Sequence, residues 1–204
     1  MPTIYQLKPA FQNILRPLVR GLAAAGVTAN QVTIAAFMLS AATGAALWRW
    51  PDAHAALLAV PLVCFVRMAL NAIDGMLARE FGQKSKLGAI LNEIGDVLSD
   101  AALYLPFAAL AGVSPALVVA VVLLAIVSEM TGVVAVQIGA SRRYDGPAGK
   151  SDRAFIFGLV GLLAGCGIAP GTWTNVLLII ELALLVATIV NRARGALHEV
   201  SPNR

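Results

Sequence analysis

Oxygen-bearing side chains on two neighbouring apolar stretches carry the chemistry that this sequence suggests. On the first stretch, Asn71 and Asp74 lie three residues apart and share one face of a helix, with Gly75 beside them. On the second stretch, small or polar residues recur at every fourth position, at Gly88, Asn92, Asp96 and Asp100. A short loop connects the two stretches, so we expect antiparallel helices whose polar faces meet. Carboxylate and carboxamide oxygens in such an arrangement suit a hard divalent cation, Mg²⁺ or Mn²⁺, which also takes oxygens from substrate phosphates.

The same residues also have a simpler structural interpretation. Asp and Asn side chains can hydrogen-bond across a helix interface, and a single acid near the end of a span can be a solvated terminus. Ionisable residues inside a membrane span are costly, at about 2.5 to 3.5 kcal/mol each, and here they gather on two facing stripes. Gly75 and Gly88 leave room for a phosphate or nucleotide to reach the backbone. The combination favours a functional site over simple packing.

The composition places both stretches in a membrane. Of the 204 residues, 59% are hydrophobic and only 13% are charged, whereas soluble domains carry about one quarter charged residues. Spanning a bilayer takes about 20 apolar residues. Stretches of that kind cover roughly 29–50, 52–78, 87–112, 114–140, 153–170 and 172–191. We therefore expect an all-α membrane protein with six transmembrane helices, forming a single domain over residues 1–204.

The segment before the first span has a different pattern. Residues 5–24 carry apolar side chains at helical spacing, with basic and polar residues elsewhere on the helical wheel. This pattern predicts an amphipathic helix lying in the membrane interface. Pro17 should bend that helix, because proline removes a backbone hydrogen bond. Thr28 or Asn30 then supplies the N-cap of the first span.

The basic residues predict the orientation. Apart from Arg49 and Arg67, all Lys and Arg fall before the first span, between spans two and three, between spans four and five, or after the last span. Cytoplasmic loops are enriched in Lys and Arg, so both termini should be cytoplasmic. The net charge of +4 is then a feature of membrane topology and does not indicate nucleic-acid binding.

The polar residues also form a long spaced motif. It runs Asp74-Gly75-Met76-Leu77-Ala78-Arg79, then eight residues, Gly88, three residues, Asn92, three residues and Asp96. This motif resembles the pattern D-x2-D-G-x2-A-R-x8-G-x3-D-x3-D of the CDP-alcohol phosphatidyltransferase family. The segment before the first span resembles the family's P-N-x2-T element, with Ala in place of Pro, in Thr28-Ala29-Asn30-Gln31-Val32-Thr33. Six spans after an interfacial helix also match the family.

The resemblance implies a phospholipid-synthesising enzyme of the bacterial inner membrane. Members of the family transfer a substituted phosphoryl group from a CDP-linked donor to an alcohol, release CMP and use a divalent metal. CDP-diacylglycerol is the donor expected for a small six-span bacterial member, and the acceptor is an alcohol. The resemblance also favours a homodimer embedded in membrane lipids.

Site residues follow from the resemblance position by position. The metal ligands would be Asn71, Asp74, Asn92 and Asp96. Asp96 would in addition be the catalytic general base that deprotonates the acceptor hydroxyl. The CDP moiety would contact Asn30, Thr33, Asp74, Gly75, Ala78, Arg79 and Gly88.

Asn71 and Asn92 depart from the family pattern, which has aspartates there. An Asn carbonyl can ligate a hard cation but brings no charge, so the motif supplies two negative charges where the family supplies four. Three interpretations stay open: a single-metal site, a two-metal site in which Glu93 or Asp100 makes up the charge, or a site without catalysis. Both replacements are isosteric oxygen donors and the other motif residues are intact, so we expect catalysis to be retained.

Three basic residues near the motif have two interpretations each. Lys150 and Arg153, at the start of the fifth span, could bind an acidic acceptor, although cytoplasmic topology alone would also explain them. Arg67 could hold the donor phosphate or could be buried as the ion-pair partner of Glu129 or Asp100.

Other functions fit part of the sequence. An aminoalcohol phosphotransferase would use CDP-choline or CDP-ethanolamine as donor, but its eukaryotic members are longer chains. A catalytically silent CDP-lipid-binding membrane protein would account for the two asparagines. A transporter would place its charges near the membrane midplane, whereas these charges lie in the cytoplasmic half.

Overall fold

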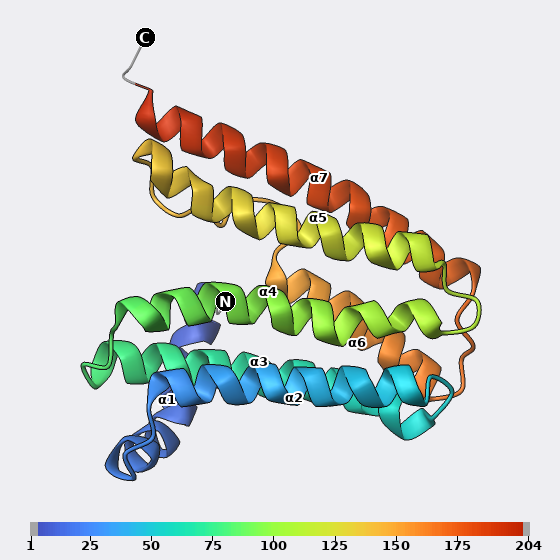
Figure 1. Ribbon diagram of the computed structural model, residues 1–204, viewed down its shortest axis with the longest axis horizontal. Coiled ribbons are helices and arrows are strands. Elements are labelled where there is room, and N and C mark those ends of the chain that lie inside the picture. Colours follow the sequence, from blue (N-terminus) through green and yellow to red (C-terminus); the bar gives the residue numbers. More distant parts are fainter. Residues whose placement is uncertain (1–3, 202–204) are drawn as a thin grey trace.

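The computed structural model describes residues 4–201, and every regular element in that range is helical (Figure 1). The α-helices are α1 (Ile4–Ala24), α2 (Ala29–Arg49), α3 (His54–Glu80), α4 (Lys86–Tyr104), α5 (Pro115–Val134), α6 (Lys150–Gly165) and α7 (Thr172–Val200). Short 3-10 helices, η1 (Leu105–Ala109) and η2 (Ala135–Ile138), continue α4 and α5. The predicted all-α class is confirmed, and each predicted span overlaps one α-helix, although the third and fourth predicted spans also take in η1 and η2.

Four helices are long and apolar enough to cross a membrane: α2, α3, α7, and α5 together with η2. Helix α4 does not meet that criterion because its 19 residues include Glu93, Asp96 and Asp100. Helix α6 has only 16 residues, or about 24 Å at 1.5 Å per residue, which is less than the hydrocarbon thickness. The protein is therefore a multi-pass membrane protein with four helices of full spanning character in the described residues.

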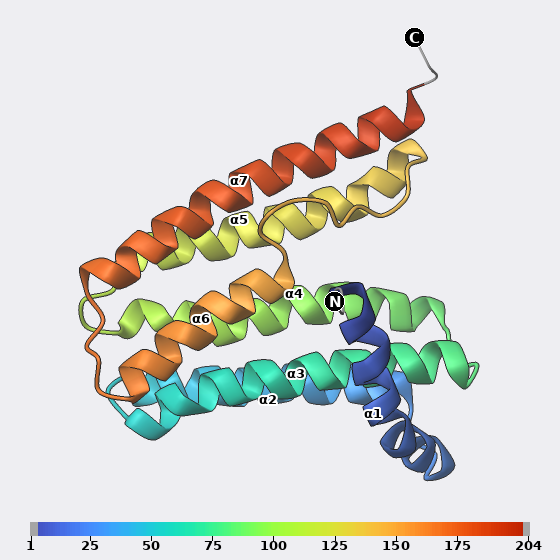
Figure 2. The ribbon, with the colours of Figure 1, turned by 180° about the vertical axis from the view of Figure 1, so that it is seen from behind.

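The helices form two groups that enclose the site. In the first group α4 packs on α2, α2 packs on α3 and α3 packs on α6, whereas α5 pairs with α7 along most of its length (Figures 1 and 2). Near η1 the α5–α7 pair lies close to α4, and it diverges from α4 toward the opposite end (Figure 1). The segment 139–149 returns from the far end of α5 to the start of α6 (Figure 2). It therefore closes part of the opening between the two groups.

Helix α1 lies across the end of α3 and has a mixed surface. Pro9 and Pro17 are both inside the helix, and Figure 2 shows its axis turning along its length, which agrees with the expected bend. Val19 is fully buried, whereas Ile14 is 76% exposed. Arg16 donates to Glu80 at the end of α3 over 3.1 Å. An exposed apolar face of this kind is what an interfacial helix presents to lipid.

Close packing between α3 and α6 depends on glycine. A Cβ added to Gly161 would lie 2.9 Å from the carbonyl oxygen of Leu57, and one added to Gly165 would lie 2.6 Å from the Leu58 side chain. The Gly161-x-x-x-Gly165 pattern therefore brings two helices of one chain together. The backbone approach brings α6 beside the polar residues of α3.

Candidate active site

A cavity of about 790 Å³ lies between α3, α4 and α6 and reaches α5, α7 and the 142–149 segment. Its polar wall includes Asn71 of α3 together with Asn92 and Asp96 of α4. Its other end is apolar and open, with Phe65 57%, Met68 51% and Phe155 69% exposed. One cavity thus joins polar motif residues to a surface suited to lipid chains.

Asp96 and Lys150 face each other across this cavity. The Lys150 ammonium, at the first residue of α6, donates to the Asp96 carboxylate. Both side chains remain 30% exposed, so a ligand in the cavity can reach them. The Lys150 ammonium therefore pairs with Asp96, the carboxylate that the motif assigns as metal ligand and general base.

Asp74 lies on the neighbouring side of α3, and its side chain does not line the cavity. It is 5% exposed and accepts a hydrogen bond of 2.9 Å from the Thr33 hydroxyl of α2. Thr28 caps the start of α2 through a capping box with Gln31, which fixes the turn that carries Thr33. The structure thus brings Asp74 and Thr33 together, two residues assigned to CDP binding.

The other residues assigned to CDP binding lie where α2, α3 and α4 meet. A Cβ on Gly88 would lie 2.8 Å from the Asn30 side-chain oxygen, so the starts of α2 and α4 are in close contact. The Arg79 guanidinium folds back over Gly75, 2.8 Å from where a Cβ would be. Ala78 packs in the small apolar cluster formed by α1, α2 and α3. None of these residues is among those that line the cavity.

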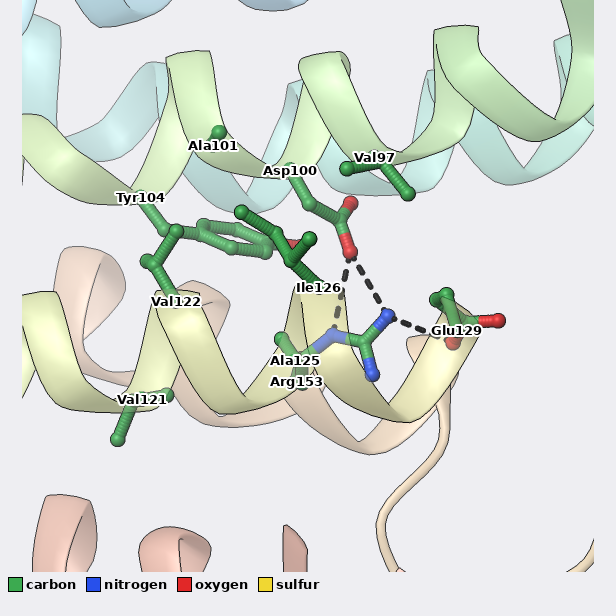
Figure 3. Close-up of a pocket in the computed structure, with 10 residues that line it drawn as sticks. All are labelled: Val97, Asp100, Ala101, Tyr104, Val121, Val122, Ala125, Ile126, Glu129 and Arg153. Atoms are coloured by element: carbon green, nitrogen blue, oxygen red, sulfur yellow. Dashed lines mark hydrogen bonds and ion pairs between the residues drawn. The ribbon is translucent and has the colours of Figure 1, made fainter. Parts of the chain in front are cut away.

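A buried network of arginines and carboxylates forms the inner wall. One carboxylate oxygen of Asp100 accepts a hydrogen bond of 2.8 Å from Arg67, and the other accepts two from Arg153, of 3.0 and 3.2 Å. Arg153 also donates to Glu129 of α5 over 3.1 Å, and Figure 3 shows its guanidinium between the two carboxylates. Of the two pairings left open for Arg67, the structure contains the one with Asp100.

A second part of the network ties the 142–149 segment to the helices. Arg142 donates through Nε and Nη2 to the two oxygens of Glu93, at 2.5 and 2.6 Å, and reaches Glu129 over 3.2 Å. Burial lowers the pKa of Arg142, but its hydrogen bonds to Glu93 more than offset this and raise the pKa above its ordinary value. Arg142 therefore stays cationic, and the carboxylates of Glu93 and Asp100 are both occupied by arginines.

One residue of the wall escaped the sequence interpretation. Arg142 lines the cavity, yet in the sequence it fits cytoplasmic topology equally well. Only the isolated Glu129 within an apolar span signalled that basic partners must exist. Glu181 of α7 is fully buried, and neither of its carboxyl oxygens has a hydrogen-bond partner among the described residues.

Comparisons with known proteins agree with the motif. The family model for CDP-alcohol phosphatidyltransferase matches residues 26–190. The Escherichia coli K12 inner membrane protein YnbA is 49% identical over 195 residues, covering 96% of each chain. The phosphatidylinositol phosphate synthase of Mycolicibacterium smegmatis is 30% identical over 215 residues, covering 99% of this chain and 95% of the relative.

Solved structures agree on the fold. The Mycobacterium tuberculosis phosphatidylinositol phosphate synthase with CDP-DAG bound has a TM-score of 0.77 at 21% identity, covering 94% of this chain and 99% of that one. A structure of the same enzyme in complex with manganese and citrate has a TM-score of 0.74 at 23% identity, covering 92% of each chain. The chain belongs to the CDP-alcohol phosphatidyltransferase family.

Proposed function

We propose that this protein transfers a phosphatidyl group from CDP-diacylglycerol to an alcohol acceptor and releases CMP. The observation that carries the proposal is that Asn71, Asn92 and Asp96 line the same cavity as exposed apolar residues. A CDP-lipid needs both surfaces at once, because its pyrophosphate is polar and its acyl chains belong in the membrane. The relatives named above as phosphatidylinositol phosphate synthases, one of them with CDP-DAG bound, support this choice of donor.

The membrane arrangement that fits this function has six spans in one domain. Helices α4 and α6 pack with α2 and α3, and α4 turns Asp96 and Asp100 inward, away from lipid. We propose that both helices cross the inner membrane with the others, that both termini are cytoplasmic and that α1 lies in the cytoplasmic interface. We also propose that the protein forms a homodimer in the membrane, as the family resemblance favours.

The residues present fit a divalent cation. The described residues contain no group of three or more His, Cys, Asp or Glu placed to hold a metal ion. The oxygen donors on the cavity wall are Asp96, Asn71 and Asn92. Asp74, the fourth proposed ligand, lies outside this lining, and its carboxylate accepts a hydrogen bond from Thr33. Oxygen donors of this kind suit Mg²⁺ or Mn²⁺, and a cation, the Lys150 ammonium, already occupies Asp96. When bound, the metal would neutralise charge on the donor pyrophosphate.

The chain's own groups account for the remaining chemistry. Asp96 takes the proton from the acceptor hydroxyl, whose oxygen then forms a bond to the phosphatidyl phosphorus. The bond from that phosphorus to the bridging oxygen breaks, and CMP leaves with the bond's electron pair. Lys150 is placed to offset the negative charge that the displaced CMP gains, and the Thr33 hydroxyl orients Asp74. Phosphoryl transfer requires this positioning and charge stabilisation more than covalent catalysis.

CMP release from CDP-diacylglycerol by purified protein in detergent tests the proposal, with Mg²⁺ or Mn²⁺ compared against a chelator over a panel of alcohols. We expect metal-dependent CMP release with at least one acceptor. Asp96→Asn should lower the rate by about 100-fold or more, the range for loss of a general base. Asp145→Asn is the matched control, because Asp145 pairs with Arg143 outside the cavity and that hydrogen bond holds the pKa of its carboxyl below the ordinary value. Equal rates for Asp96→Asn and the wild type would refute the role of Asp96.

A further inference from the structure

The charges on the cavity wall are balanced. Among the described residues, its lining contains four basic side chains, Arg67, Arg142, Lys150 and Arg192, and four acidic ones, Glu93, Asp96, Asp100 and Glu129. A cavity built to collect two anionic substrates would be expected to carry an excess of positive charge. The CDP-lipid pyrophosphate itself brings negative charge into this space, which a bound divalent cation would offset, and the side chains of the wall hold no positive surplus for a second anion.

Each cation on the wall is already engaged by a carboxylate. Arg142 binds both oxygens of Glu93, in the fork geometry that would otherwise hold a phosphate. Arg192 lies 3.3 Å from Glu129 and also donates to the Ser128 carbonyl over 2.6 Å. Since these groups are satisfied inside the protein, a phosphate would have to displace a carboxylate to use them.

The same carboxylates offer a different kind of contact. Glu93 and Asp96 keep 34% and 30% of their side chains exposed, and both line the cavity. An ionised carboxylate only accepts hydrogen bonds, so it pairs well with the hydroxyl groups of a neutral molecule. Toward a phosphate it is repulsive, which selects against that ligand.

We propose that the acceptor is an uncharged polyhydroxy alcohol and that Glu93, through its hold on Arg142, excludes phosphorylated alcohols. This inference rests on the proposed transferase function and adds the chemical class of its second substrate. Glu93 is then a specificity-determining residue, because it pairs with the Arg142 guanidinium that a phosphate group would otherwise bind.

The first test compares pairs of acceptors that differ only by a phosphate: glycerol with sn-glycerol 3-phosphate, and myo-inositol with myo-inositol 1-phosphate. With CDP-diacylglycerol as donor, CMP release should be about tenfold or more faster with the neutral member of a pair at equal concentration. Faster release with the phosphorylated members would overturn the inference while leaving the transferase intact. Absence of CMP with every acceptor would refute the transferase, and the binding measurement below would still decide the charge preference.

The second test measures binding without catalysis. Equilibrium dialysis of labelled myo-inositol 1-phosphate compares wild type with Glu93→Gln, in which Arg142 loses its anionic partner. We expect binding to be about tenfold tighter in the variant. Glu199→Gln is the matched control, because Glu199 pairs with Arg143 away from the cavity and its loss should leave binding unchanged. Equal affinity in wild type and Glu93→Gln would overturn the inference.

Discussion

Replacing Asp100 by asparagine should destabilise the protein strongly, because Asp100 is the hub of the buried arginine network. It is 5% exposed and accepts three hydrogen bonds, one from Arg67 and two from Arg153. The two arginines are themselves only 3% and 2% exposed. Asparagine keeps the size of the side chain but removes the negative charge between them.

The size of the effect follows from which arginine loses its partner. Arg153 retains Glu129 at 3.1 Å, whereas no other carboxylate pairs with Arg67 in the described residues. Removing one partner of a buried ion pair costs about 3 to 5 kcal/mol, and the retained Glu129 places this variant near the lower limit. For a chain of this length, about 3 kcal/mol corresponds to a decrease in Tm of about 6 to 12 °C.

Thermal unfolding of the purified protein in detergent, followed by circular dichroism, measures this decrease. Glu199→Gln serves as the control, since its pair with Arg143 is 38% exposed on the Glu199 side and an exposed pair contributes less than about 1 kcal/mol. A Tm for Asp100→Asn within about 2 °C of both the wild type and the control would refute the network as a source of stability.

Three further substitutions test other contacts. Thr33→Val removes the hydroxyl that donates to Asp74 over 2.9 Å. The affinity for CDP-diacylglycerol, measured from the substrate dependence of CMP release, should weaken about tenfold, which corresponds to the loss of about 1.5 kcal/mol for a hydrogen bond to a charged group. An unchanged affinity would contradict the role of Thr33 in orienting Asp74. Gly88→Ala places a Cβ 2.8 Å from the Asn30 side-chain oxygen. CDP-lipid binding should fall because Asn30 must move, whereas the Tm should stay near that of the wild type because the Asn30 side chain can rotate away from the new methyl group. Gly161→Val places a Cβ 2.9 Å from a carbonyl of α3 and should lower stability by about 1 to 3 kcal/mol in the same thermal assay, whereas an unchanged Tm would show that the helices can separate freely.

Hydropathy predicted the helices well because lipid requires long apolar segments. Each of the six predicted spans overlaps an α-helix, and Thr28, one of two residues expected as N-cap, caps α2. The hydropathy and charge criterion for a membrane span excludes α4 for a physical reason. Asp96 and Asp100 face the interior of the protein, where basic side chains pair with them: Lys150, Arg67 and Arg153. An average of hydropathy along the sequence counts these charges as if they faced lipid.

The site was predicted less completely because helix rotation and long side chains decide it. Periodicity placed Asn71 and Asp74 on one face of α3, but the packing of α2 turns Asp74 toward Thr33 and leaves Asn71 in the cavity. The bond between Arg142 and Glu93 joins residues 49 positions apart. No spacing rule predicts such a contact, and the basic loop alone had a sufficient explanation in membrane topology.

Simultaneous measurement of both products of one reaction decides whether this protein is a phosphatidyltransferase. Purified protein is incubated with CDP-diacylglycerol labelled in the lipid and in the cytidine, a divalent metal and a polyhydroxy alcohol, and the labelled lipid and CMP are quantified. We expect CMP and a new phosphatidyl alcohol in equal amounts, and Asp96→Asn should slow the formation of both by about 100-fold or more. CMP accompanied by phosphatidic acid alone, or no CMP although the CDP-lipid binds, would contradict a phosphatidyltransferase built on Asp96, Asn71 and Asn92.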